Sequence, residues 1–262
     1  MKPILTLVFT LFFAAVTVAQ RQPQPSQKNE TKLFDPGSEN AELIADSVIA
    51  VYALFNDKAR FAQIRRTMVE TGKKTVTKLD GTSEEIGYTK QVIRGESLEK
   101  ERIRIDQNSP TLRYSLVYNQ GEIFGILGET TFSPKAEIIV DFENEIWHSL
   151  EALFRYKEDG SKVSVAGREK YLGVELIQLD LIDRRNRKTR YFISAKTFRV
   201  MWLDYESGGV KYRRKFHDYR LSQGMLVPYR TVLWAGDRKI EEVNVLTVTF
   251  GQKVDESLFS KS

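Results

Sequence analysis

The sequence contains no cysteine, and only two of its 262 residues are histidine. Without thiols the chain can form no disulfide, hold no metal through thiolates and use no cysteine nucleophile. A bacterial lipoprotein carries its lipid on a cysteine just after the signal, so we expect this protein not to be lipid-anchored itself. Its fold must therefore be held together by the packing of its core.

Recognisable catalytic motifs are also lacking. The chain has neither the Gly-x-Ser-x-Gly elbow of hydrolases nor a phosphate-binding Gly-Lys-Ser/Thr loop. Glu145 and His148 have the Glu-x-x-His spacing of di-metal sites, but such sites need two of these pairs in a helical bundle. His217 and Asp218 are neighbours in a predicted strand, so their side chains should point to opposite faces.

We therefore expect no catalytic residue, no bound metal and no cofactor, and we interpret the chain as a binding protein and not an enzyme. A hydrolase built on the two histidines and their acidic neighbours is the weakest of the alternatives. A pair of carboxylates acting without histidine would leave no local motif.

A long apolar run occurs only at the start of the chain. Residues Ile4 to Val18 are almost all apolar, but this run of about 15 residues is shorter than the roughly 20 needed to span a bilayer. With a positive start at Lys2 and small residues leading to Ala19, it predicts a signal peptide over 1–19 and export to the periplasm. An uncleaved membrane anchor is the alternative.

The segment after the predicted cleavage site is polar. Residues 20–37 are rich in Gln, Pro, Ser and charge, so we expect a disordered leader. The remaining 38–262 show no domain boundary and no internal repeat, and we expect them to form one domain.

Apolar residues at helical spacing predict two helices, over 38–55 and 141–156. Ser38 and Asp141 are suitable first residues, since both can cap the amide groups of a helix N-terminus. Both helices have an apolar stripe that must be buried.

Elsewhere the apolar period is two, as in half-buried strands. Ile103 and Ile105 alternate with charged residues, and the same pattern occurs over 112–119. Further strands are predicted over 161–168, 173–182, 188–195, 198–206, 209–220, 225–235 and 239–250. We therefore predict a mainly β (α+β) fold: a strongly curved antiparallel sheet, or incomplete barrel, covered by helices.

Basic residues are concentrated in two stretches, 184–190 and 211–215, in a chain of net charge +5. Such stretches can bind anionic headgroups at a membrane surface, or they can form a solvated turn and strand face. Export argues against nucleic acid as a partner.

The chain is rich in aromatic residues, with 15 Phe, 11 Tyr and 3 Trp. The inner face of a curved sheet either packs against a covering helix or lines a cavity, and composition does not separate the two. If there is a cavity, the candidate ligand-binding residues are Ile103, Ile105, Leu112, Tyr114, Leu116, Ile146, Leu150, Phe154 and Trp202.

The second half of the chain carries a series of short motifs in a fixed order. They are Tyr171-Leu172-Gly173-Val174-Glu175, Tyr191-Phe192-Ile193 followed by Lys196-Thr197, Trp202-Leu203-Asp204-Tyr205 before Gly208-Gly209, Gly224 to Pro228, and Asp255 to Phe259. This order resembles the LolA-like group of outer-membrane lipoprotein-sorting proteins (the LolA/LolB-type carrier superfamily). The resemblance covers about residues 161–260, and the first half matches in layout only.

The resemblance implies an incomplete antiparallel barrel whose open side is covered by helices. It also implies a soluble periplasmic carrier that shelters the acyl chains of lipids or lipoproteins during envelope sorting. Relatives of this fold bind other lipids or sense envelope stress. The alternative is therefore a protein-interaction or stress-sensor module without a lipid cavity, whose partner is an envelope protein.

Overall fold

The computed structural model describes residues 40–53 and 58–261. The predicted signal peptide, 1–19, and the predicted leader, 20–37, lie outside the described residues, as does Ser38. Within the described part, no helix is both long and apolar enough to cross a membrane.

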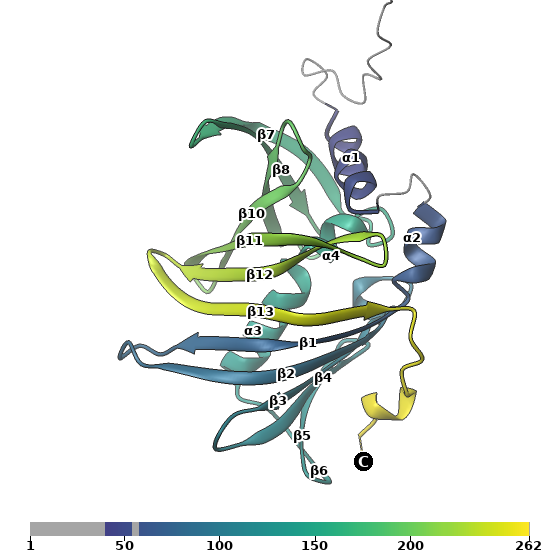
Figure 1. Ribbon diagram of the computed structural model, residues 1–262, viewed down its shortest axis with the longest axis vertical. Helices are drawn as coiled ribbons and strands as arrows, with labels where there is room; N and C mark the ends of the chain where they lie inside the picture. Colours follow the sequence, from purple (N-terminus) through teal and green to yellow (C-terminus); the bar gives the residue numbers. More distant parts are fainter. Residues whose placement is uncertain (1–39, 54–57, 262) are drawn as a thin grey trace, which may run out of the picture. The chain divides into compact units, whose positions relative to one another are not determined.

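Thirteen strands form one antiparallel sheet in the described part of the chain (Figure 1). The strands are β1 (Thr67–Thr77), β2 (Ser83–Ile93), β3 (Arg102–Asn108), β4 (Arg113–Asn119), β5 (Glu122–Leu127), β6 (Thr130–Phe132), β7 (Lys162–Tyr171), β8 (Val174–Ile182), β9 (Lys188–Ser194), β10 (Val200–Ser207), β11 (Val210–Ser222), β12 (Met225–Ala235) and β13 (Arg238–Phe250). The strands β1 to β6 and β7 to β13 each pair with their neighbours in the sequence, and the pairing of β1 with β13 joins the two series. The edges are β6 and β7, so the sheet is curved but not closed, and the predicted fold class is confirmed.

Six helical segments accompany the sheet within residues 40–53 and 58–261. They are α1 (Ala41–Ala53), α2 (Lys58–Ile64), α3 (Ala136–Trp147), α4 (Leu150–Phe154) and the short 3-10 turns η1 (Leu98–Lys100) and η2 (Glu256–Phe259). The Oδ1 atom of Asn40 accepts hydrogen bonds from the Glu42 and Leu43 amides, so Asn40 caps α1.

The single helix predicted over 141–156 is wrong. The structure has two helices there, and the first begins at Ala136, two residues after Pro134, with Asp141 in its interior. The break comes at Ser149, whose hydroxyl accepts a hydrogen bond from the Ala152 amide and caps α4. Serine competes for backbone amides in this way and therefore starts a new helix.

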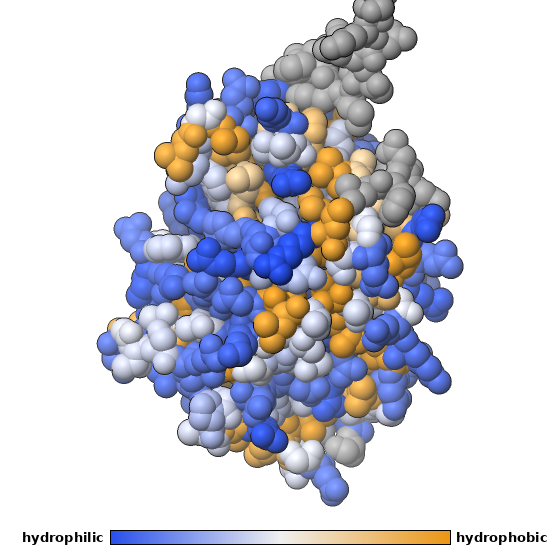
Figure 2. All heavy atoms as spheres, viewed as in Figure 1, coloured by the Kyte–Doolittle hydropathy of each residue, from blue (hydrophilic) through white to orange (hydrophobic). Residues whose placement is uncertain are grey.

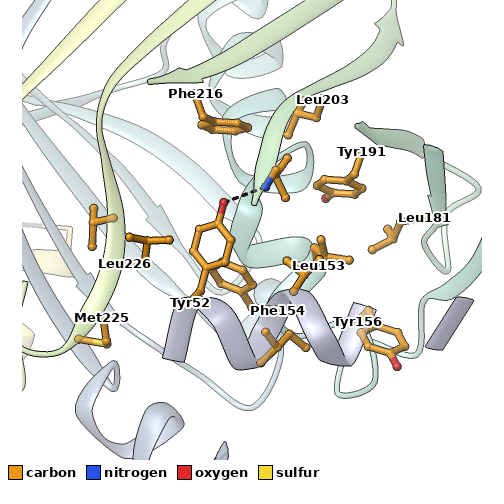
Figure 3. Close-up of a cluster of buried hydrophobic side chains, with 14 of the residues drawn as sticks. Tyr52, Leu153, Phe154, Tyr156, Leu181, Tyr191, Leu203, Phe216, Met225 and Leu226 are labelled. Carbon is orange, nitrogen blue, oxygen red and sulfur yellow. Dashed lines mark hydrogen bonds between the residues drawn. The ribbon is translucent and has the colours of Figure 1, made fainter. Parts of the chain in front are cut away.

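The face of the sheet that α3 and α4 cover, here called the inner face, carries the main core. Figure 3 shows Tyr52 of α1, Leu153 and Phe154 of α4, and Leu203 and Phe216 of the sheet within one apolar cluster. Alternation places them there: in β3, Ile103 and Ile105 are buried while Arg102 and Arg104, which alternate with them, are only partly buried.

The opposite face, here called the outer face, carries two smaller apolar clusters. Phe259 of η2 is fully buried against Val117 and Phe124 of β4 and β5. Phe192 and Trp202 stack on β9 and β10, with ring centroids 4.7 Å apart. In the view of Figure 2, hydrophilic residues cover most of the surface and apolar side chains lie in small areas between them.

Candidate ligand-binding site

A cavity of about 250 Å³ lies between the inner face of the sheet and the helices α3 and α4. Its apolar wall includes Val92 and Val248 of the sheet, Phe250 at the end of β13, and Leu98 of η1. The helices supply the opposite wall because the apolar stripe of α3 and the side chains of α4 turn toward the sheet.

Five of the nine predicted ligand-binding residues line this cavity, and they come from one strand and two helices. They are Ile103, Ile105, Ile146, Leu150 and Phe154. The structure thus brings together residues that lie as far apart in the sequence as Ile103 and Phe154. Ligand binding by these residues stays a prediction.

The other four predicted residues lie away from the cavity. Leu116 is buried in the same core cluster, and Tyr114 is half-buried beside Phe132. Leu112 precedes β4 and is 49% exposed. Trp202 belongs to the outer-face cluster, because its neighbour Leu203 occupies the inward position.

Charged side chains also line the cavity, and most of them belong to no motif of the sequence. Where α3 crosses the sheet, the Lys90 ammonium lies 2.6 Å from a carboxylate oxygen of Glu145, and the Tyr88 hydroxyl donates to Glu70 at 2.8 Å. Burial raises the pKa of Glu145, but Lys90, Lys74 and Arg214 more than offset this and lower it to about 2. Glu145 is therefore an ionised partner of the sheet and not a proton donor.

A second charged group, here called the arginine cluster, consists of Arg65, Arg94, Arg155, Glu101 and Glu151. Arg94 lies 2.9 Å from Glu101 and 3.0 Å from Glu151. Arg155 lies 2.5 Å from Glu101, and Arg65 pairs with Glu151. These side chains are at most 13% exposed, so the cluster forms a buried wall where α4 meets the link between α2 and β1, the end of β2 and the start of β3.

A second cavity, of about 460 Å³, lies beyond this wall, beside α1 and α2. Both cavities are lined by Arg65, Arg94, Glu151 and Phe154. The arginine cluster thus separates two spaces that adjoin each other.

The two histidines take no part in a reactive arrangement. The ring of His148 is buried, stacks on Tyr205 with centroids 4.1 Å apart, and has its Nδ1 atom 2.7 Å from the Thr189 hydroxyl. Burial, with Arg214 and Arg187 nearby, lowers the pKa of His148 to about 3, so the ring is neutral. Asp218, the neighbour of the other histidine, pairs with Arg220 at 2.6 Å.

Metal ligands do not converge in the described residues, where no group of three or more His, Asp or Glu side chains is placed to hold an ion. Glu145 pairs with Lys90 and His148 bonds to Thr189, so the Glu-x-x-His pair serves two separate structural contacts.

Most of the basic stretch 184–190 is neutralised by nearby acids. Arg187 lies 2.6 Å from Asp183, and Lys188 and Arg190 share Asp180 at 2.7 and 2.6 Å. In the second stretch, Arg213 lies 2.7 Å from Asp204. These contacts favour the interpretation that both stretches form a solvated surface whose basic residues pair with acids of the same chain.

No protein-family model matches the chain, and no curated protein matches it. Solved structures do resemble it. A DUF1329 family protein from Desulfovibrio piger aligns with a TM-score of 0.62 at 9% identity, covering 85% of this chain and 98% of that one. A LolA superfamily protein from Nitrosomonas europaea aligns with a TM-score of 0.58 at 11% identity, covering 84% and 97%.

A domain assigned to outer-membrane lipoprotein sorting, from Vibrio parahaemolyticus, aligns with a TM-score of 0.56 at 13% identity, covering 85% of this chain and 98% of its own. At these identities the likeness is one of fold and not of function. The alignments nevertheless extend over nearly the whole length of each of the three structures. The chain therefore has the LolA-like fold, the one that its C-terminal motifs resemble.

Proposed function

We propose that this protein is a soluble periplasmic carrier that binds the acyl chains of lipids or lipoproteins between the inner face of its sheet and α3 and α4. The observation that carries the proposal is the apolar wall of the cavity there, contributed by Ile103, Ile105 and Leu150 among others. Burying apolar surface is worth roughly 25 cal/mol per Å², so such a wall can hold an acyl chain without a covalent bond.

The size of the cavity is consistent with this role. About 250 Å³ is close to the lower end, roughly 300 Å³, of the pockets that hold small ligands. The adjoining cavity of about 460 Å³ offers further room. Two of the similar structures belong to the LolA superfamily or to lipoprotein sorting, which supports export to the periplasm and a sorting role.

Binding, and not catalysis, is the function that the charged residues support. Most acids and bases at the cavity are held in ion pairs, as in Lys90 with Glu145 and Arg94 with Glu101, whereas Glu70 accepts a hydrogen bond from the Tyr88 hydroxyl. A general acid or base needs a pKa near the working pH. The pKa of Glu145, at about 2, is far below that range.

Native mass spectrometry tests the proposal on protein that is exported in a bacterial host and purified without detergent. A co-purifying lipid or acylated peptide, identified after organic extraction, is the expected result. A mass that equals the bare chain, and stays so after incubation with phospholipid and lipopeptide, would overturn the carrier proposal and favour the protein-interaction module.

Leu150→Asp tests the position of the site. Leu150 is the first residue of α4, where an acidic side chain suits the helix N-terminus, so the helix should survive the change while the cavity wall gains a charge. Lipid retention should be lost. Leu221→Asp, on a side chain that is 62% exposed, is the matched control and should retain lipid.

A further inference from the structure

The arginine cluster has an excess of positive charge and of hydrogen-bond donors. Its ion-pair network joins three guanidinium groups to two carboxylates. Asp159 is a further acid near Arg155, but its Oδ1 atom accepts a hydrogen bond from the Leu98 amide, and no ion pair links it to the arginines in the described residues. Of the other charged residues around the second cavity, Asp46 is half-buried and pairs with Lys157, and the rest are exposed to solvent, which screens them.

Arg65 is the member whose donors are least used. It is 8% exposed and pairs with Glu151, but its Nε atom is buried without any hydrogen-bond partner. Arg94, in comparison, uses its Nε on the Arg65 carbonyl at 3.0 Å and its two terminal nitrogens on carboxylates. A buried donor without a partner is costly, so an additional acceptor would be favourable at Arg65.

Aromatic rings surround the same guanidinium. Its carbon lies 4.8 Å from the ring centroid of Phe61, 5.1 Å from that of Phe154 and 5.5 Å from that of Phe250. These contacts stabilise the positive charge and leave the rings available to apolar chains on either side. Cationic and apolar surface therefore meet at one point, between the two cavities.

We propose that the arginine cluster is the headgroup site of the carrier, and that its ligand is an amphiphile with an anionic group, a carboxylate or a phosphate. The anion accepts hydrogen bonds from Arg65 and its neighbours, and the acyl chain lies along the apolar wall that runs past Ile103 and Leu150. Guanidinium groups recognise both of these oxyanions in the same geometry. The inference rests on the proposed function. The carrier proposal places the acyl chain of the ligand, and this inference places the headgroup of the same ligand.

The test compares three ligands that share one sixteen-carbon chain: hexadecanoate, hexadecyl phosphate and uncharged hexadecanol. Binding of each labelled ligand to the full chain is measured by equilibrium dialysis. At least one anion should bind about tenfold more tightly than the alcohol, the fold-change of a charge-assisted hydrogen bond. The preferred anion also names the headgroup chemistry.

Two variants of the ion pair should change this preference in opposite directions. Arg65→Gln removes one positive charge and should reduce the anion preference to about threefold or less, whereas Glu151→Gln frees guanidinium donors and should increase it. Arg185→Gln, which removes an arginine that is 57% exposed on the surface, is the matched control and should change nothing. If Arg65→Gln does not fold, the comparison of the three ligands on the wild type and the effect of Glu151→Gln still test the headgroup site.

The possible failures are distinct. Equal binding of the three ligands would overturn the headgroup site and leave the carrier standing. Binding of none of them, with no lipid found in the purified protein, would overturn the carrier and the headgroup site together. An anion preference that persists unchanged in both variants would place the headgroup away from this cluster.

Discussion

The Lys90 ammonium on β2 lies 2.6 Å from a carboxylate oxygen of Glu145 on α3, and this ion pair fixes the helix to the inner face of the sheet. Apolar contacts alone would allow the helix to slide, because dispersion and burial have little directionality. Lys74 pairs with Glu241 at 3.4 Å on the same face. The helix α3, which covers the cavity, is therefore positioned by ion pairing as well as by apolar packing.

Lys90→Met should destabilise the fold, because Glu145 would lose its partner while it remains partly buried. Losing one partner of a fully buried pair costs about 3 to 5 kcal/mol, and we expect about 1 to 3 kcal/mol for these half-buried side chains. Urea unfolding measures the change. Lys73→Met is the matched control: Lys73 pairs with Glu85, both more than half exposed, and its loss should cost less than about 1 kcal/mol.

His148 should make the stability of the protein depend on pH. Because the pKa of His148 falls from its usual 6.5 to about 3 on folding, the unfolded chain binds the proton more readily. The contribution of the neutral His148 ring to the free energy of unfolding is complete above pH 6.5 and is lost as the pH falls toward 3. Over this range the free energy of unfolding falls with a slope approaching about 1.4 kcal/mol per pH unit.

The measurement is urea unfolding at several pH values between 7 and 4, comparing the wild type with His148→Gln. The variant should be less stable at pH 7, because it loses the ring stacking on Tyr205, and should lose less stability on acidification. His217→Gln removes the other histidine, whose pKa is also lowered, by partial burial and by Arg230 and Lys215, so this variant should reduce the slope but by less than His148→Gln does. Parallel curves for the wild type and His148→Gln would contradict a buried neutral ring.

Tyr52 should be required for the attachment of α1. Its hydroxyl accepts a hydrogen bond from the Val200 amide at 3.2 Å and lies 2.7 Å from the Tyr219 hydroxyl, which in turn donates to the Val200 carbonyl at 2.6 Å (Figure 3 shows the first contact). Tyr52→Phe leaves a buried amide without an acceptor and should cost about 1 to 3 kcal/mol.

Hydrogen exchange of the Val200 amide, together with urea unfolding, checks this prediction. Tyr171→Phe is the matched control, because Tyr171 is 44% exposed and should tolerate the loss of its hydroxyl. Unchanged protection of Val200 in Tyr52→Phe would show that the hydrogen bond is not formed.

Gly95 should not tolerate a side chain. A Cβ atom there would lie 2.2 Å from the backbone oxygen of Lys100, and the Gly95 carbonyl also accepts a hydrogen bond from Arg155. Gly95→Ala should therefore cost about 1 to 3 kcal/mol and disturb the arginine cluster. Gly87→Ala, where the nearest atom would be 3.7 Å away, should be nearly neutral when the two variants are compared by thermal unfolding.

The sheet could largely be predicted from the sequence, because alternation records which residues face the core. The range predicted as 173–182 is β8, Val174–Ile182, and 225–235 is β12, Met225–Ala235. Alternation fails where two neighbours are both apolar. Trp202 and Leu203 are such a pair, and only the structure shows that Leu203 takes the inward position.

The charged part of the site could not be predicted, because its partners are far apart in the sequence. Lys90 and Glu145 are separated by 55 residues, and Arg65 and Glu151 by 86. A weak signal was present in β1, where polar residues occupy both faces, so that Glu70 and Lys74 point inward. Charge on the inner face of a strand indicates buried polar partners.

The pairing of β1 with β13 also has a consequence for how the chain acquires its structure. In this join Met68 lies opposite Phe250, and the last strand completes the wall that the first one begins. All of the strands between them must be synthesised before the join can form, so neither half of the cavity is finished while the chain is still being made. Such distant pairing makes folding slow. A chain that folds this slowly is suited to the export proposed above, because it can still be threaded through an export channel while unfolded, and its cavity would be assembled only afterwards.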